Sequence, residues 1–479
     1  MNTASTWLAR GMARLHPGAL AAPRAVKASA GNSGTVRPPA SPRTEPTGFT
    51  RDEQRLLKML QAIVAPQISE VEAVHRAEVV AQWHASASAA QRLQMWRMLS
   101  EQFAPDGRQV AAARDLFDSA QGTAEEGAAE IRLRKALVSP RTRLLQRFSA
   151  MPGGMRFLLD LRAELLQQLK VEKRLLALDA ELEALFSTWF DVGFLELRRI
   201  SWDSPASLIE KLIKYEAVHD IRSWADLKNR LDSDRRCYGF FHPRLSDEPL
   251  IFVEVALLGS MPGSIAPLLD ETAAPSDLTR ATTAIFYSIS NTQTGLRGVS
   301  FGESLIKRVV ETLHQEFPKL RTYVTLSPIP GFRAWLSRHA QAMLEATPRR
   351  ERTELARLVQ QAGMDADDEA AAVLTLLETS RDHAADSPLP SWLMHCAAHY
   401  LGRELQDGRP VDAVARFHLG NGARVERINW GGDPGAKGWK QSYGIMVNYL
   451  YDLKRLDRHR QQLGQGKIAV SGEVSKLLF

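Results

Sequence analysis

The sequence is poor in cysteine, in long apolar runs and in excess charge. Its 479 residues hold only two cysteines, Cys237 and Cys396, which excludes a disulfide framework and a thiolate zinc cluster and is typical of a reducing compartment. No apolar run reaches the ~18 residues that a membrane span needs, so no membrane partner is expected. Lys and Arg outnumber Asp and Glu by only 61 to 55, which is too small and scattered an excess for a nucleic-acid partner but fits a polyanionic small ligand.

The remaining composition is that of a globular protein with more than one domain. Apolar residues make up 44% and charged residues 24% of the chain, so a packed core is expected. A length of 479 residues exceeds one ordinary core and predicts two or three domains.

The first 48 residues differ in composition and are predicted to form a disordered basic tail. Up to position 44 they contain six Lys or Arg and no acid, with many Ala, Gly, Ser and Pro. Mitochondrial transit peptides share this acid-poor, Arg-bearing character. The sequence therefore favours a bacterial cytoplasmic protein and leaves the mitochondrial matrix as the alternative.

Residues 49–190 predict a helix bundle. Apolar side chains recur at helical spacing, first at Leu56, Leu60 and Ile63, and Gly or Pro residues separate the helical stretches. Clustered His and Gly-rich loops are absent from this half of the sequence. We therefore expect it to serve in packing and assembly, with regulation as the alternative.

From residue 191 the pattern changes and predicts an α+β domain with a largely antiparallel sheet. Two short helices begin after Ser204 and Ser223, and 412–430 shows strand spacing around a predicted hairpin turn at Asn421-Gly422. Residues 333–405 return to helical spacing and predict a helical insertion. The predicted strands are 194–200, 237–241, 250–258, 282–290 and 321–326, and 442–453 is a last strand or helix start.

The stretch 282–332 predicts a binding site. A β-branched and aromatic strand leads into a loop with Gly295, Gly298 and Gly302, and an amphipathic helix follows. Such a unit presents backbone N–H groups and a helix N-terminus, which are suited to bind a phosphate. The alternative interpretation is that these glycines only form turns. The next strand ends at Ser327, which two prolines hold in a fixed turn.

Single residues give weaker signals than this stretch. His418 follows a predicted strand beside a tight turn, where a side chain can point into a cleft, but a lone histidine is more often structural. Ser327 lies outside a Gly-x-Ser-x-Gly elbow, which argues against a hydrolase nucleophile. His395 and His399 have metal-ligand spacing, but Cys396 takes the place of the general base and no third ligand is evident, so helix packing is preferred.

Several uncommon segments, in one order, resemble the malonyl-CoA decarboxylase family. The resemblance is close over about 190–453 and implies a helical N-terminal domain, 49–190, followed by a catalytic domain, 191–479, similar to the GNAT-type N-acetyltransferases, with a helical insertion at about 333–405. The matching segments are 236–243 (RCYGFFHP), 248–255 (EPLIFVEV), 295–299 (GLRGV), 305–310 (LIKRVV), 326–332 (LSPIPGF), 417–423 (FHLGNGA), 427–430 (RINW) and 447–451 (VNYLY).

The resemblance also implies a site for each end of a substrate. The family's catalytic residues map onto Ser327, His418 and Tyr451. In the acetyltransferase-like fold the pyrophosphate of coenzyme A rests on the loop and helix start after the fourth strand. Leu296 stands where the acetyltransferase loop has its first Gly. Ser300 stands where some members of the family have an acidic residue. The residues that the loop maps onto are Arg297, Gly298, Val299, Ser300, Phe301, Gly302 and Glu303.

The implied reaction is the decarboxylation of malonyl-CoA to acetyl-CoA and CO₂, a step of fatty acid metabolism. The resemblance implies no metal, and it implies no separate cofactor because coenzyme A is part of the substrate. The enzyme must orient the carboxylate, stabilise the enolate oxygen and protonate the α-carbon. We expect Ser327 to be the positioning or proton-accepting group and His418, with an ordinary pKa of ~6.5, to be the general acid. The alternatives are an acyl-CoA acyltransferase on the same fold and a CoA-sensing scaffold. The family further implies a homotetramer built through the helical domains.

Overall fold

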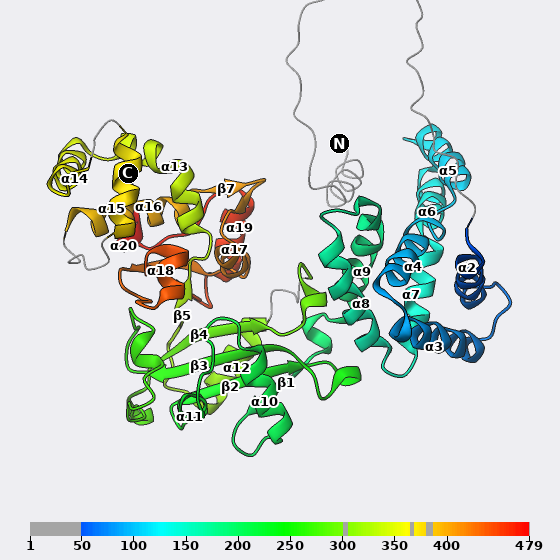
Figure 1. The fold of residues 1–479 in the computed structure, drawn as a ribbon, viewed down its shortest axis with the longest axis horizontal. Coiled ribbons are helices and arrows are strands. Elements are labelled where there is room, and N and C mark those ends of the chain that lie inside the picture. Colours follow the sequence, from blue (N-terminus) through cyan, green and yellow to red (C-terminus); the bar gives the residue numbers. More distant parts are fainter. Residues whose placement is uncertain (1–48, 300–304, 365–367, 380–386, 479) are drawn as a thin grey trace, which may run out of the picture. The chain divides into compact units, whose positions relative to one another are not determined.

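The computed structural model describes residues 49–299, 305–364, 368–379 and 387–478 (Figure 1). The chain divides into two compact units, Met1–Phe186 and Ser187–Phe479. The predicted tail, 1–48, and the loop residues Ser300, Phe301, Gly302 and Glu303 lie outside the described residues. None of the described helices is both long and apolar enough to cross a membrane.

The first unit is helical, as its apolar spacing predicts. Ser88 starts one helix with a capping box, in which its side chain accepts from the Gln91 N–H and the Gln91 side chain accepts from the Ser88 N–H. Leu158, Leu161 and Leu165 lie on one face of another helix and are buried. The helices are α2 (Arg51–Ile63), α3 (Glu70–Ser86), α4 (Ala89–Glu101), α5 (Gly107–Ala120), α6 (Glu126–Leu137), α7 (Pro140–Ala150), α8 (Gly154–Gln168) and α9 (Leu176–Trp189).

The second unit is built on a mixed sheet whose strand order is β1-β2-β3-β4-β5-β10-β6, with β9 paired to β10. The β4–β5 pair is parallel and joined through α12 (Leu305–Glu316), and the other pairs are antiparallel, which confirms the predicted mixed, largely antiparallel sheet. The strands are β1 (Glu196–Ile200), β2 (Arg235–Phe241), β3 (Pro249–Leu258), β4 (Thr283–Asn291), β5 (Thr322–Thr325), β6 (Ser327–Pro328), β9 (Arg424–Asn429) and β10 (Met446–Leu450).

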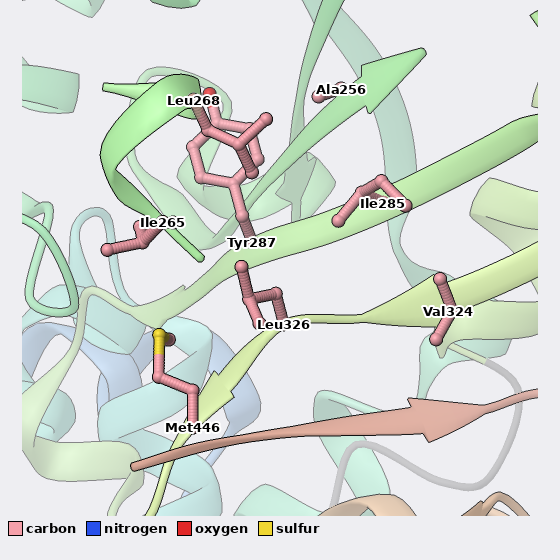
Figure 2. Close-up of a cluster of buried hydrophobic side chains, with 8 residues drawn as sticks. All are labelled: Ala256, Ile265, Leu268, Ile285, Tyr287, Val324, Leu326 and Met446. Carbon is pink, nitrogen blue, oxygen red and sulfur yellow. The ribbon is translucent and has the colours of Figure 1, made fainter. Parts of the chain in front are cut away.

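Apolar side chains form two clusters on one face of this sheet, since Phe252 and Ala256 of β3 point to the same side and Ile285 pairs with Ala256. In the first cluster, α10 (Ala206–Tyr215) and α11 (Trp224–Arg230) pack Leu212 and Leu227 against Cys237 and Phe252 of β2 and β3. Figure 2 shows a second cluster, to which β3, β4, β5, β10 and the turn after β3 contribute. Its members are Ala256, Ile265, Leu268, Ile285, Tyr287, Val324, Leu326 and Met446. The strands that carry the site are therefore held by a common core.

The predicted helical insertion is present between β6 and β9. It comprises α13 (Phe332–Ala346), α14 (Arg349–Gln361), α15 (Glu369–Thr379) and α16 (Pro388–Gly402), followed by a small hairpin of β7 (Leu405–Gln406) and β8 (Arg409–Pro410). Tyr400 of α16 packs against Phe332 and Trp335 of α13, with ring centroids 5.8 and 5.1 Å apart. The insertion thus has its own aromatic core beside the chain segments that enter and leave it.

The predicted hairpin at Asn421-Gly422 is wrong. The chain forms α17 (Ala413–Gly420) before this turn, because the Asp412 side chain caps the helix by accepting from the Val414 and Ala415 N–H groups. Asn421 then ends the helix, and Gly422 turns the chain with φ +86° into β9, which pairs with β10. A tight turn signal marks this helix end as readily as a hairpin, since both favour glycine at positive φ.

Candidate active site

A cavity of about 550 Å³ lies in the second unit, where β4, the loop before α12, β6 and α17 converge. Two segments far apart in the sequence line it. One is β4 with the glycine loop that follows it, and the other is α17, which follows the insertion. The lining residues are Val218, Ile251, Phe286, Tyr287, Ser288, Ile289, Asn291, Leu296, Gly298, Val299, Leu305, Ser327, Pro328, Ala413, Val414, Arg416, Phe417, His418, Gly420 and Asn421.

Ser327 enters this cavity from the first residue of β6. Its backbone is fixed by pairing with Val447 of β10, and Pro328 follows it directly. The side chain is only 6% exposed, and its hydroxyl donates to Oγ1 of Thr325 over 2.9 Å. Thr325 Oγ1 also accepts from the Tyr449 N–H at 3.2 Å, so the serine hydroxyl has a preset orientation.

His418 reaches the same point from α17. Its Nε2 atom lies 3.3 Å from Ser327 Oγ, and its Nδ1 atom lies 2.7 Å from the hydroxyl of Tyr451. The ring stacks on Tyr449 with centroids 4.7 Å apart. The structure therefore brings together all three residues that the sequence predicts as catalytic, with Tyr451 behind the imidazole and Ser327 in front of it.

Burial sets the charge of this imidazole, and the Tyr451 hydroxyl sets its tautomer. Desolvation lowers the pKa of His418 to about 3 and raises the pKa of Tyr451, so both side chains are neutral near pH 7. Within the described residues His418 is the one hydrogen-bond partner of the Tyr451 hydroxyl, which must therefore donate to Nδ1. We assign the imidazole proton to Nε2, which faces Ser327 and the cavity. The expectation of an ordinary pKa for His418 is wrong, because burial removes the water that would solvate the charged ring.

The predicted phosphate loop borders the same cavity. Gly298 and Val299 line it, and Leu305 at the first turn of α12 lines it as well. Gly298 has φ +83°, a backbone conformation that favours glycine, and Arg297 lies directly before it at the end of a 3₁₀ turn. The cavity thus joins the loop expected to bind phosphate with the Ser327–His418 pair.

Two family models match consecutive parts of the chain. The one described as the malonyl-CoA decarboxylase C-terminal domain matches residues 193–479, and the one described as the N-terminal domain matches residues 103–190. The chain belongs to the malonyl-CoA decarboxylase family. The resemblance seen in the sequence is thereby confirmed, and the chain is an enzyme of the carboxy-lyase class.

Individual members of the malonyl-CoA decarboxylase family agree over most of the chain. The mitochondrial malonyl-CoA decarboxylase of Rattus norvegicus is 36% identical over 417 residues, which cover 84% of this chain and 85% of the relative. The crystal structure of malonyl-CoA decarboxylase from Rhodopseudomonas palustris has 40% identity and a TM-score of 0.76, covering 88% of this chain and 99% of that one. That from Cupriavidus metallidurans has 45% identity and a TM-score of 0.72, covering 90% and 100%.

Sequence reasoning missed two residues that hold this decarboxylase-family site together, Thr325 and Tyr449. Thr325 orients the Ser327 hydroxyl, and Tyr449 stacks on the imidazole and donates its N–H to Thr325. A signal was present, because extended chain places residues two apart on the same side, and each missed residue stands two positions before a predicted one. Arg416, which lines the cavity from α17, carried no comparable signal.

The histidine pair of α16 has other partners. His395 Nδ1 lies 2.7 Å from the Leu477 carbonyl oxygen, and His399 Nε2 lies 3.2 Å from Glu404 Oε1. In the described part of the chain no three His, Cys, Asp or Glu side chains are grouped as metal ligands. His242 caps a 3₁₀ turn by accepting from the Arg244 N–H.

Proposed function

We propose that this chain removes the carboxylate of malonyl-CoA as CO₂ in the cavity between Ser327 and the glycine loop, and protonates the remaining enolate to give acetyl-CoA. The observation that carries the proposal is the 3.3 Å separation of His418 Nε2 and Ser327 Oγ at the wall of a cavity that Gly298 also lines. One cavity then offers polar groups for the acyl end and loop backbone for the phosphate end of a single long substrate.

The proposed decarboxylation needs no redox reagent and no covalent bond between the enzyme and the substrate. When the bond between the α-carbon and the carboxylate breaks, its electron pair moves onto the thioester carbonyl and forms an enolate, and CO₂ leaves. Ser327 is suited to hold the carboxylate out of the thioester plane or to donate to the enolate oxygen when its one hydroxyl proton turns from Thr325 Oγ1 to the substrate. The carbonyl system of the substrate is itself the electron sink.

The proton for the α-carbon must come from a neighbouring group. His418 is neutral near pH 7, since burial lowers its pKa to about 3. A malonyl carboxylate brought into this buried space stabilises the imidazolium, so substrate binding raises the pKa of His418 and draws in the one proton that the reaction consumes. His418 Nε2 then gives a proton to the α-carbon after CO₂ has left, and Tyr451 keeps Nδ1 oriented throughout.

The phosphate end of the substrate is assigned to the loop before α12. Gly298 and Val299 line the cavity at this end, and we extend the assignment to Arg297, Ser300, Phe301, Gly302 and Glu303 by their place in the same loop. A glycine at positive φ supports it, because it lets backbone N–H groups turn toward an anion without a side chain in between.

Incubation of the purified chain with malonyl-CoA alone tests this function. We expect acetyl-CoA and CO₂ in equal amounts with no free CoA and no added cofactor. Release of free CoA that depends on an acceptor amine or alcohol would instead indicate an acyltransferase. Tight binding of malonyl-CoA without any product would indicate a sensing or scaffolding protein, and either result would overturn the proposal.

We propose further that the chain acts as a homotetramer in a bacterial cytoplasm. Its identity to the solved bacterial relatives, 39–45%, exceeds its identity to the mitochondrial ones, 35–36%, which supports the bacterial compartment. Light scattering of the full chain at micromolar concentration tests the tetramer. Import of a fluorescent fusion of residues 1–48 into isolated mitochondria would contradict the bacterial assignment.

A further inference from the structure

Ser327 and His418 belong to the two chain segments that enter and leave the helical insertion. The turn after Ser327 runs through Gly331 into α13, and α17, which carries His418, starts after Asp412. Eighty-one positions separate Gly331 from Asp412. A pair that depends on a distance of 3.3 Å needs these two segments to be fixed to each other.

One carboxylate joins them. Asp412 Oδ1 accepts from the Val414 and Ala415 N–H groups at 2.9 and 3.0 Å, which caps the first turn of α17. Asp412 Oδ2 accepts from the Gly331 N–H at 3.2 Å and from the Tyr400 hydroxyl at 3.5 Å. The side chain is only 2% exposed, and it is absent from the described residues that line the cavity, whereas the next residue, Ala413, lines it.

The backbone at Gly331 is shaped to reach this carboxylate. A Cβ atom built on Gly331 would lie 2.4 Å from the Tyr400 hydroxyl oxygen and 3.3 Å from Asp412 Oδ2. A larger residue would therefore push the tyrosine and the carboxylate away from the turn. Glycine lets the N–H donate directly, and Tyr400 closes the remaining side of the carboxylate.

We infer that Asp412 is a positioning residue of the decarboxylation site, which fastens the turn after Ser327 to the start of α17 and so sets the distance between Ser327 and His418. The inference rests on the proposed function. The two carboxylate oxygens act separately, since Oδ1 holds the helix that carries His418 and Oδ2 holds the turn that follows Ser327. A residue that supplies only one acceptor can cap the helix or hold the turn, but it cannot join the two.

Asp412→Ser separates the helix cap from the attachment to the turn. Serine is as good a helix cap as aspartate, but its single short hydroxyl cannot reach Gly331 as well. We expect kcat for acetyl-CoA formation to fall about 10- to 100-fold, as for a misplacement of reacting groups by ~1 Å. The KM for malonyl-CoA and the affinity for acetyl-CoA should stay within about 2-fold, because no group that lines the cavity is removed.

Asp106→Ser is the matched control. Asp106 caps α5 in the first unit by accepting from the Arg108 and Gln109 N–H groups, the same cap that Asp412 makes, and it has no second segment to hold among its hydrogen bonds within the described residues. It should leave kcat unchanged. Asp412→Asn is the second variant, because an amide presents one acceptor and one donor and must also lose one of the two attachments.

Four outcomes are distinguishable. A lower kcat with unchanged KM in both Asp412 variants, measured on protein that binds acetyl-CoA with wild-type stoichiometry, supports the inference. A kcat within about 2-fold of wild type in a folded Asp412 variant overturns it, as does a loss of acetyl-CoA binding in parallel with activity, which marks a general structural role. If the wild-type chain itself does not turn over malonyl-CoA, it is the proposed function that fails.

Discussion

His418 Nε2 lies 3.3 Å from Ser327 Oγ although 91 positions separate the two residues in the sequence. A short strand paired to β10 supplies the serine, and a helix that begins at a buried aspartate supplies the histidine. The serine hydroxyl is already committed as a donor to Thr325, which leaves its lone pairs toward the imidazole and the cavity. The pair is therefore arranged for a hydrogen bond from Nε2 to Oγ.

Ser327→Ala removes the acceptor of this bond and the hydroxyl that we propose to contact the acyl end of the substrate. We expect kcat for acetyl-CoA formation to fall about 100- to 1000-fold, the usual effect of removing one hydrogen-bond donor to an oxyanion, since the Ser327 proton can turn from Thr325 to the substrate. KM should change little, because the loop to which we assign the phosphate end is untouched. Steady-state assays check this. Ser337→Ala, on α13 outside the cavity lining, is the control and should keep full activity.

His418→Asn removes the proposed proton donor while keeping a polar side chain of similar reach. Decarboxylation should drop about 100- to 10,000-fold, as for loss of a general acid, while acetyl-CoA still binds in calorimetry. His339→Asn provides the comparison, since His339 bonds to the Trp335 carbonyl oxygen and does not line the cavity among the described residues. Full activity in His418→Asn would refute the assignment of this residue.

Tyr451→Phe should leave the imidazole of His418 in place but no longer fix which ring nitrogen carries the proton. Without the hydroxyl, Nδ1 of His418 loses its buried donor, and the proton can move from Nε2 to Nδ1, away from Ser327. One buried hydrogen bond of ~1.4 kcal/mol corresponds to about a 10-fold lower kcat. Nitrogen chemical shifts of the labelled imidazole should change from one tautomer to a mixture.

The chain offers a matched pair for this test. The Tyr323 hydroxyl lies 3.2 Å from His314 Nδ1, the same chemical pair, and neither residue lines the cavity in the described part of the structure. Tyr323→Phe should therefore leave kcat within about 2-fold of wild type. An equal loss in both variants would show that Tyr451 acts through stability and not through the tautomer.

The fold was predictable from the sequence wherever one periodicity ran for long enough. The helices of 49–190, the strands β2 to β5 and the four insertion helices follow the apolar spacing of their own residues. The error at 412–430 arose because the segment is short and its strongest signal, Asn421-Gly422, fits a helix end as well as a hairpin. What decided between them was the cap at Asp412, a single side chain whose effect depends on its hydrogen bonds.

The site was predictable in its residues but not in its electrostatics. Ser327, His418 and Tyr451 came from a resemblance, and the structure brings them into contact. The low pKa of His418 follows from burial by residues distant in sequence, such as Tyr449, which no local pattern reveals. The same holds for the second attachment of Asp412, because the Gly331 N–H is opposite it only in the folded chain.

Stability of the helical unit should fall as the pH drops below about 6.5. Burial, and next the nearby Arg92, lower the pKa of His84 to about 4, so the unfolded chain takes up this proton at higher pH than the folded chain does. The free energy of unfolding then decreases from the unfolded pKa down to the folded one, by up to ~1.4 kcal/mol per pH unit. Urea midpoints between about pH 7.5 and 4.5 measure this.

His84→Leu should flatten that part of the curve, because leucine fits the apolar contacts of the ring and cannot take up a proton. The ring packs against Phe157 at 5.3 Å between centroids. His75→Leu, on the same helix but with an exposed side chain, is the control and should keep the wild-type pH dependence. An unchanged slope in His84→Leu would rule out this histidine as the source of acid sensitivity.

Arg230 pairs with the buried carboxylate of Glu254. Replacing Arg230 should be the most destabilising of these changes. Its guanidinium donates to Glu254 Oε2 at 2.9 Å and to Asp226 Oδ1 at 2.7 Å, and both Arg230 and Glu254 are at most 1% exposed. Burial, opposed by Arg230, raises the pKa of Glu254 to about 7. Arg230→Met leaves this carboxylate without its cation, which typically costs about 3–5 kcal/mol.

The pH dependence of the Arg230→Met defect identifies its cause. Without the cation the folded pKa of Glu254 rises further above its unfolded value, so the folded chain binds the extra proton, and the defect should shrink as the pH falls from about 8 to 6. Arg230→Met combined with Glu254→Gln should recover part of the lost stability at about pH 8, because the unpaired charge is gone. If the double variant is less stable than the single one at that pH, the loss comes from the packing of the guanidinium and its bonds to Asp226 and the His219 carbonyl oxygen.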